Sequence, residues 1–375
     1  MSSLARACNY KVLVPYEPPS WIGPALLPQV PSHRVTLART NTPIHEWKLA
    51  TTPAPFSLAI KRDDMTGSTL SGNKVRKLEF LLADAKKKQC TAVITCGGLQ
   101  SNHCRATAIA ARELGMDSYL FLRSPTNDPN SIKFDGNLLL DRMVGAKIFL
   151  VPLKASQARD LQPRMDRLTR ELKDRCHVTA YPIPIGGSNL VGFWGYVEAF
   201  RELLNQGVPD DYTDLVFACG SGGTASGLSV ANQLTGNRLG VHAVAVCDDK
   251  NYFYGHVNET LRGLGLLNEY KAEDILDVID GYKGRGYGLS TDEELDFVSS
   301  VSKTTGILLD PTYTGKAAFG MINEMRLRPE RFRGKKVLFI HTGGVFGLFD
   351  GRQIFPKDRH GIKTWFDLDN IPEID

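Results

Sequence analysis

Residues 214–224, DLVFACGSGGT, combine the two features on which our fold prediction rests, a short apolar run and a turn of glycines. Short apolar runs that end at glycine or charge are typical of buried strands. Six more runs have this character: SLAIKRD (57–63), TAVITCGG (91–98), SYLFLR (118–123), KIFLV (147–151), VHAVAVC (241–247) and KVLFIHTGG (336–344). Helical patterns lie between them, with apolar faces over residues 75–85 and 106–114. This alternation predicts an α/β fold in which helices cover both faces of parallel sheets.

The composition is that of an ordinary globular protein. The chain has 375 residues, 42% hydrophobic and 23% charged, and this length favours two domains. No apolar run approaches the roughly 18 residues that a membrane-spanning helix needs. The net charge of +4 is too small and too dispersed to favour nucleic acid as a partner. Nine prolines punctuate residues 14–55, which we expect to form an arm packed over a domain.

The cysteines and the first residues bear on the compartment. Seven cysteines, with no Cys-x-x-Cys pair, favour a reducing compartment and predict no metal site. Residues 1–11, MSSLARACNYK, lack the apolar core of a signal peptide. They are basic, contain serine and lack acids, as mitochondrial presequences do. We therefore expect a cytoplasmic protein, with a mitochondrial location as the alternative.

Glycine-rich turns follow three of the expected strands, at 96–103, 219–224 and 341–344, and a fourth glycine pair at 186–187 lies in an expected loop. Open α/β sheets bind ligands at such strand ends. The turn at 219–224 suits a phosphate, because glycines allow close approach and a following helix adds its positive end. It lacks the Gly-Lys-Ser/Thr of a nucleoside-triphosphate loop, and Ala225 replaces the third glycine of a dinucleotide fingerprint. The alternative is a tight turn that only packs strand against helix.

Lys74 stands at the start of the predicted helix that follows Ser71-Gly72-Asn73. The positive end of a helix disfavours an ammonium group and so lowers the pKa of the lysine. A neutral amine is the nucleophile that condenses with a carbonyl group. A lone lysine at a helix start is usually only solvated, so the prediction depends on its combination with a phosphate-binding turn.

Six stretches together resemble the D-cysteine desulfhydrase and 1-aminocyclopropane-1-carboxylate (ACC) deaminase family, within the fold type II enzymes that use pyridoxal 5′-phosphate. They occur in the family's order between about residue 40 and about residue 350. The stretches are KRDDMTGSTLSGNKVRKLEFLLADA, ITCGGLQSNHCRATAIAA, IPIGGSNLVGFWGYVEA, ACGSGGTASGLS, LDPTYTGKAAFG and LFIHTGG.

The resemblance implies a role for each matching residue. Lys74 would hold pyridoxal phosphate as a Schiff base and move protons at the substrate. The phosphate would lie on Gly220, Ser221, Gly222, Gly223 and Thr224. Asn102 would hydrogen-bond the 3′-oxygen of the cofactor, and Thr342 would meet its pyridine nitrogen.

The substrate would be held by a second group of residues. Ser101, Asn102 and His103 would bind its carboxylate, Tyr313 would face it, and Thr314 would belong to the same substrate-binding group. Lys74, Ser101 and Tyr313 are the catalytic candidates. His103 has an alternative reading as a cap on a carbonyl, and Cys104 is expected in the core.

The substrate prediction rests on Thr314. ACC deaminases resemble this chain around Tyr313 but have glutamate at the position of Thr314. A carboxylate would favour a protonated pyridine ring, the strong electron sink that cyclopropane opening requires. Thr314, Thr342 and Ser-Asn-His follow the desulfhydrase pattern. The resemblance therefore implies β-elimination of D-cysteine to pyruvate, ammonia and hydrogen sulfide.

Three kinds of alternative stay open. Within the same class are an ACC deaminase, an L-cysteate sulfo-lyase, and a serine or aspartate racemase or dehydratase. A nucleotide-dependent oxidoreductase is the second kind, and a pyridoxal phosphate-binding protein without turnover is the third. The resemblance also implies a large domain of residues 1–75 plus 200–375, a small domain of residues 76–199, cofactor in the cleft between them, and a homodimer.

Overall fold

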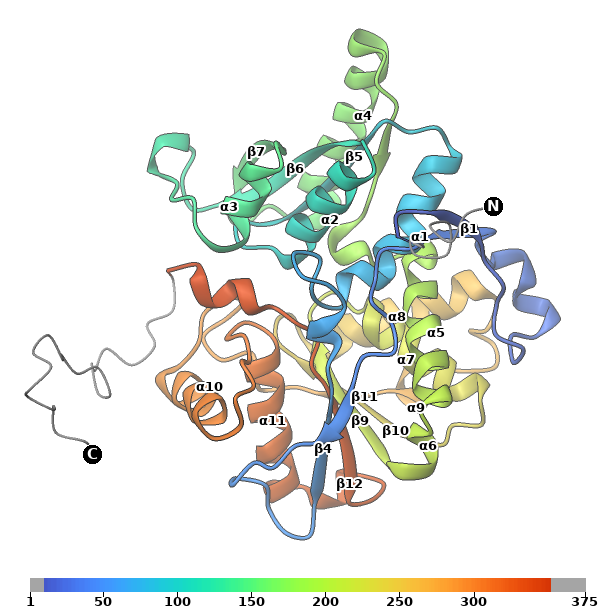
Figure 1. The fold of residues 1–375 in the computed structure, drawn as a ribbon, viewed down its shortest axis with the longest axis vertical. Helices are drawn as coiled ribbons and strands as arrows, with labels where there is room; N and C mark the ends of the chain where they lie inside the picture. Colours follow the sequence, from blue (N-terminus) through green and yellow to red (C-terminus); the bar gives the residue numbers. More distant parts are fainter. Residues whose placement is uncertain (1–9, 352–375) are drawn as a thin grey trace, which may run out of the picture.

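The computed structural model describes residues 10–351, which form two main sheets with helices around them (Figure 1). The larger sheet has six strands in the order β11-β10-β9-β12-β4-β3. Its strands are β3 (Ile44–Glu46), β4 (Ser57–Lys61), β9 (Asp214–Cys219), β10 (Gly240–Ala245), β11 (Asp277–Ile279) and β12 (Lys336–Ile340). All neighbours in it are parallel except β3 and β4.

The smaller sheet is fully parallel and has the order β7-β6-β5-β8. Its strands are β5 (Ala92–Gly98), β6 (Asp117–Ser124), β7 (Lys147–Pro152) and β8 (Ala180–Pro182). A separate antiparallel pair joins β1 (Leu13–Pro15) to β2 (His33–Val35). The α/β prediction is confirmed, and each of the seven apolar runs forms a strand. The five strands that we did not predict, β1, β2, β3, β8 and β11, have three residues each.

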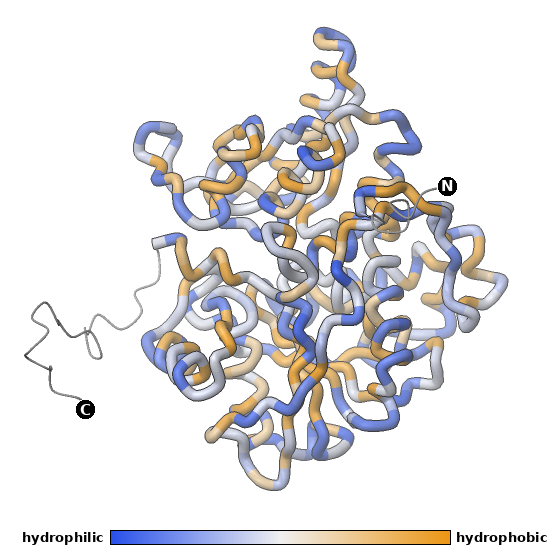
Figure 2. The backbone as a smooth tube through the Cα atoms, in the orientation of Figure 1, coloured by the Kyte–Doolittle hydropathy of each residue, from blue (hydrophilic) through white to orange (hydrophobic). Residues whose placement is uncertain are grey.

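Helices separate the strands along the chain. They are α1 (Lys74–Lys87), α2 (Asn102–Glu113), α3 (Gly136–Met143), α4 (Gln162–Cys176), α5 (Leu190–Asn205), α6 (Val208–Asp211), α7 (Gly223–Leu234), α8 (Lys250–Leu264), α9 (Ala272–Ile275), α10 (Asp292–Thr305) and α11 (Thr314–Leu327). The two helices expected from their apolar faces are α1 and α2. In Figure 2 apolar segments concentrate where the strands of the larger sheet cross the interior.

Separate apolar cores cover the two faces of the larger sheet. Helices α5, α7 and α8 supply one core, and α10 and α11 supply the other. The proline-rich arm contributes to both, since Tyr16 packs in the first and Trp47 in the second, as expected of an arm over a domain. The domain boundary expected near residue 200 falls inside α5, which packs on both α1 and α7.

Two further observations concern residues 10–351 only. None of their helices combines the length and the apolar character needed to span a bilayer. They also contain no cluster of three or more histidine, cysteine or acidic side chains arranged to hold a metal ion. The N-terminal residues on which the mitochondrial alternative rests lie mostly outside the described range.

Candidate active site

A pocket lies where strands of both sheets end, and its lining includes residues that follow β5, β9 and β12. Counted out to its open mouth, the space between the lining residues is about 400 Å³. The lining residues are Asn73, Lys74, Asn102, Ala218, Cys219, Gly220, Ser221, Gly222, Thr224, Tyr313, Thr342 and Gly343. The fold therefore brings together most of the residues singled out from the sequence. Four others, Ser101, His103, Gly223 and Thr314, are not part of this lining.

Lys74 opens helix α1, and its side chain lines the pocket. The segment before it is held against the turn after β12, since the N–H of Asn73 donates to the carbonyl of Thr342 (3.0 Å). Gly72 has φ +101°, and a Cβ there would lie 2.7 Å from the same carbonyl oxygen. Burial lowers the pKa of Lys74 to about 8, and the charge of Arg105 acts in the same direction. We expected a lowered pKa from the helix end, whereas burial is the main cause.

The turn between β9 and α7 forms an open cradle of backbone N–H groups. Gly222 (φ +84°) is the N-cap residue that precedes α7, and it offers no side-chain cap. The first N–H groups of the helix are therefore left for a ligand. Neighbouring side chains fit closely around the glycines. A Cβ on Gly220 would lie 2.9 Å from the ring of Tyr313, and one on Gly222 would lie 2.3 Å from His256.

Lys77, which we did not single out from the sequence, lies beside this cradle. Its Nζ donates to the carbonyl of Gly186 (3.1 Å) and to Ser188 Oγ (3.4 Å), and Ser188 Oγ lies 2.8 Å from Ser221 Oγ. Burial and the nearby charge of Lys74 hold the pKa of Lys77 well below its usual value. Its spacing from Lys74 was the available signal, because residues three apart on a helix share a face.

The start of α2 sends consecutive side chains in different directions. Ser101 caps the helix, its Oγ accepting from the N–H of Cys104 (3.1 Å), and Asn102 lines the pocket. His103 is buried with Nε2 2.9 Å from Thr95 Oγ1, and burial keeps its pKa well below the usual value. Cys104 is buried in an apolar cluster, as expected.

Tyr313 faces the pocket at the start of α11, and its hydroxyl lies 2.5 Å from that of Tyr287. Burial raises the pKa of Tyr313 well above its usual value, so this phenol is protonated. Sequence analysis missed Tyr287, an aromatic residue between glycines in a loop of the larger-sheet part. Its ring reaches toward the end of β5, 3.8 Å from where a Cβ on Gly98 would lie.

Thr314 and Thr342 differ in where they point. The hydroxyl of Thr314 donates to Asp310 Oδ1 (2.7 Å), and the residue is fully buried. Asp310 also accepts from the N–H groups of Thr312 (3.0 Å) and Tyr313 (2.8 Å). Thr342 lines the pocket instead. Of the two threonines, only Thr342 therefore lines the pocket. Thr314, on which the substrate prediction rested, points to Asp310 instead.

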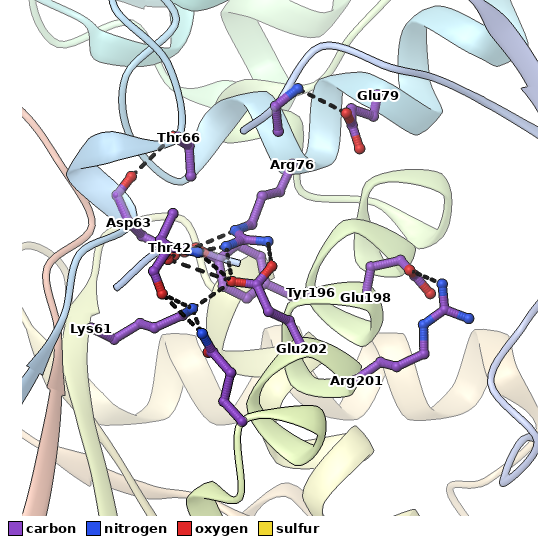
Figure 3. Close-up of polar contacts among 12 residues, drawn as sticks. Thr42, Lys61, Asp63, Thr66, Arg76, Glu79, Tyr196, Glu198, Arg201 and Glu202 are labelled. Carbon is purple, nitrogen blue, oxygen red and sulfur yellow. Dashed lines mark hydrogen bonds and ion pairs between the residues drawn. The ribbon is translucent and has the colours of Figure 1, made fainter. Parts of the chain in front are cut away.

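A buried ion-pair network lies beneath the first turn of α1 (Figure 3). Arg76 pairs with Asp63 (2.8 Å) and with Glu202 of α5 (3.0 Å), and Lys61 of β4 pairs with Glu202 as well. Burial alone would raise the pKa of Glu202, but the charges of Arg76 and Lys61 lower it to about 2. Asp63 is thus a scaffold charge, and the network fixes α1 two residues after Lys74.

Comparison with known proteins places the site in context. The family model described as pyridoxal-phosphate dependent enzyme matches residues 35–343. The chain is 45% identical to the Arabidopsis thaliana bifunctional D-cysteine desulfhydrase/1-aminocyclopropane-1-carboxylate deaminase, mitochondrial, covering 93% of this chain and 87% of that protein. It is 32% identical to a Yersinia pestis D-cysteine desulfhydrase, covering 84% and 95%. A solved ACC deaminase homologue matches with TM-score 0.73 and 35% identity over 88% of this chain and 97% of the other.

Proposed function

The chain belongs to the family of pyridoxal-phosphate-dependent enzymes, and from that premise we propose that it is a carbon–sulfur lyase acting on D-cysteine. The reaction takes D-cysteine and water to pyruvate, ammonia and hydrogen sulfide. The observation that carries this function is one pocket that holds both a partly buried amine with a lowered pKa and an uncapped glycine turn. The names of two relatives, from Arabidopsis and Yersinia, support the choice of substrate.

The residues present fit pyridoxal phosphate. The N–H groups at the start of α7 would hold its phosphate, with the amine of Lys77 beside them. Lys74 would hold its aldehyde carbon, Asn102 its 3′-oxygen and Thr342 its ring nitrogen, since all three line the same pocket. When bound, pyridoxal phosphate withdraws electrons from the substrate and makes its Cα proton acidic.

The residues of the chain then bind the substrate and move its protons. The N-terminus of α2, with Ser101 and Asn102, would attract the substrate carboxylate. Lys74 Nζ would take the proton from Cα. The hydroxyl of Tyr313 supplies a proton to the sulfur as the Cβ–S bond breaks, and Tyr287, 2.5 Å away, holds that hydroxyl. The three-carbon fragment that is left when sulfide departs keeps the amino group. It takes up water to give pyruvate and ammonia.

The lining favours elimination from cysteine over cyclopropane opening. None of the described residues that line the pocket is acidic, so the ring nitrogen would meet the neutral hydroxyl of Thr342. A neutral partner withdraws less electron density than a carboxylate-bound pyridinium would. Loss of a thiolate makes the smaller demand, because sulfide is a good leaving group. ACC deamination remains the second candidate, because the Arabidopsis relative is named for both activities.

Assembly and compartment belong to the same proposal. We infer a homodimer, as the family resemblance implies. The cysteines of the described chain, Cys90, Cys96, Cys104, Cys176, Cys219 and Cys247, are all free thiols, which fits a reducing compartment such as the cytoplasm or the mitochondrial matrix.

The test is a substrate panel with purified, cofactor-loaded protein. Sulfide and pyruvate release are measured with D-cysteine, L-cysteine, L-cysteate, D-serine and ACC. We expect equal amounts of sulfide and pyruvate from D-cysteine, and much slower pyruvate release from ACC. Turnover of ACC without sulfide release from D-cysteine would replace the proposal with the second candidate.

A further inference from the structure

The side chain of Asn102 contacts the start of helix α3, where Asn137 is fully buried. Asn137 Nδ2 donates to Asn102 Oδ1 (3.0 Å). We propose that Asn137 is a positioning residue, which determines which end of the Asn102 carboxamide faces the cofactor. The proposal rests on the proposed function, because it assigns a partner to the residue that would hold the 3′-oxygen of pyridoxal phosphate.

Two contacts fix the orientation of Asn137 itself. Nε of Arg105, a group that can only donate, lies 3.1 Å from Asn137 Oδ1. The carbonyl of Gln100, which can only accept, lies 3.2 Å from Asn137 Nδ2. If the Asn137 amide were flipped, its NH₂ group would face the Arg105 donor and its oxygen would face the Gln100 carbonyl. Neither hydrogen bond could then form. Its NH₂ group must therefore point toward Asn102.

The surrounding contacts make this arrangement rigid. The N–H of Asn137 donates to Gln100 Oε1 (2.8 Å), and Gln100 Nε2 donates to Asp135 Oδ1 (2.7 Å). Arg105 is also held by the carbonyls of Thr69 and Ser71 (3.1 Å for the latter) in the segment that leads to Lys74. The ring of Phe346 covers the Arg105 guanidinium from 4.8 Å.

The consequence appears at the pocket. Because Asn102 Oδ1 accepts from Asn137, the NH₂ group of Asn102 is the end left to face a ligand. The 3′-oxygen of pyridoxal phosphate is a phenolate when the cofactor absorbs visible light, and an N–H donor stabilises that form. A reversed amide would place an oxygen against it and repel it.

The decisive variant is Asn137→Asp, which keeps an acceptor for Arg105 but presents an oxygen to Asn102. We expect the Asn102 amide to reverse. The Kd for pyridoxal phosphate should then rise about tenfold, and absorbance should move from the visible band to the near ultraviolet. Spectrophotometric titration of apo protein with pyridoxal phosphate measures both effects. Asn137→Ala, which leaves the amide of Asn102 free to turn, should give a smaller shift in the same direction.

Two controls separate positioning from simple destabilisation. Asn232→Asp changes another buried asparagine, at the end of α7, whose amide contacts Leu239 and Asn237. It should lower the melting temperature while leaving Kd and spectrum unchanged. In an Asn102→Ala background, Asn137→Asp should alter Kd less than about twofold. Asn137 acts through Asn102, so the effects of the two substitutions on Kd are not additive.

Each outcome decides the proposal. A wild-type Kd and spectrum in Asn137→Asp would overturn it, as would an undiminished effect in the Asn102→Ala background. If Asn137→Asp does not fold, because Asp141 lies one turn away on α3, the same two comparisons are made with Asn137→Ala. Absence of a visible band in the wild-type protein is a separate result, and it would contradict the proposed function instead.

Discussion

At the scale of residues, the site contains two lysines one turn apart, the buried Lys77 and the partly exposed Lys74, whose amines have different surroundings. Lys77 Nζ is held by Gly186 and Ser188 beside the cradle, whereas Lys74 Nζ lines the pocket. Burial lowers the pKa of both amines. In our proposal Lys74 is therefore the nucleophile, whereas the position of Lys77 would suit it to an anion.

The pKa of Lys74 predicts how fast apo protein takes up pyridoxal phosphate at different pH values. The neutral amine is the reactive form, and its fraction grows as pH rises through the pKa. The rate at which the visible band appears should therefore rise with pH through a midpoint near 8 and then level off. Stopped-flow absorbance measures it, with Lys74→Ala as the variant that gives no band. A midpoint near 10.5, the ordinary lysine value, would show that the amine is not buried as described.

Sequence analysis picked out most of the residues that line the pocket, but it could not give the direction in which each side chain points. Lys74 could be picked out from its place at a helix start, whereas the roles of Asn102, Tyr313 and Thr342 came from the resemblance of their segments to the family. Successive residues on a helix point about 100° apart, so a motif cannot say which neighbour faces the pocket. That is why His103, adjacent to Asn102, turns toward Thr95 instead.

At the scale of elements, the charged network under α1 connects β4, α1 and α5. Arg76, Asp63, Glu202 and Lys61 are all buried and mutually paired. Their separation along the chain explains why sequence patterns did not reveal them as a unit. The network holds the first turn of α1, and hence the backbone that carries Lys74.

Removing one member of this network should strongly destabilise the fold. Arg76→Met leaves two buried carboxylates with one fewer cation, and breaking a buried pair in this way costs about 3–5 kcal/mol. Arg175→Met is the matched control, since Arg175 pairs with Glu171 on the exposed face of α4, where a pair contributes at most about 1 kcal/mol. Urea unfolding of the two apo variants measures the difference. Equal losses would mean that the buried network adds nothing to stability.

At the scale of the whole molecule, the two sheets meet at one pocket. Seven apolar runs gave the long strands correctly, because burial on both faces makes a strand apolar throughout. The three-residue strands are too short to show a recognisable pattern of apolar and polar residues. The packing of α5 on α1 depends on tertiary contacts that no local pattern records.

This arrangement predicts that the cofactor stabilises the entire chain. Asn102 follows β5, whereas Gly220 follows β9 and Thr342 follows β12, so a bound ligand would contact parts built on both sheets. Pyridoxal phosphate at a hundred times its Kd should add about 2.7 kcal/mol to the free energy of unfolding. Denaturant unfolding with and without the cofactor measures this gain. Hydrogen exchange should slow at the start of both α2 and α7, and slowing at only one of them would contradict a shared site.

The central claim is that the amine of Lys74 carries the cofactor. The direct measurement is borohydride reduction of the loaded protein, followed by proteolysis and mass spectrometry of the labelled peptide. Our account predicts a single pyridoxyl group on Lys74, with none on Lys77. Lys87→Ala, at the exposed end of the same helix, should label like the wild type. A label on Lys77, or no label at all, would contradict the account.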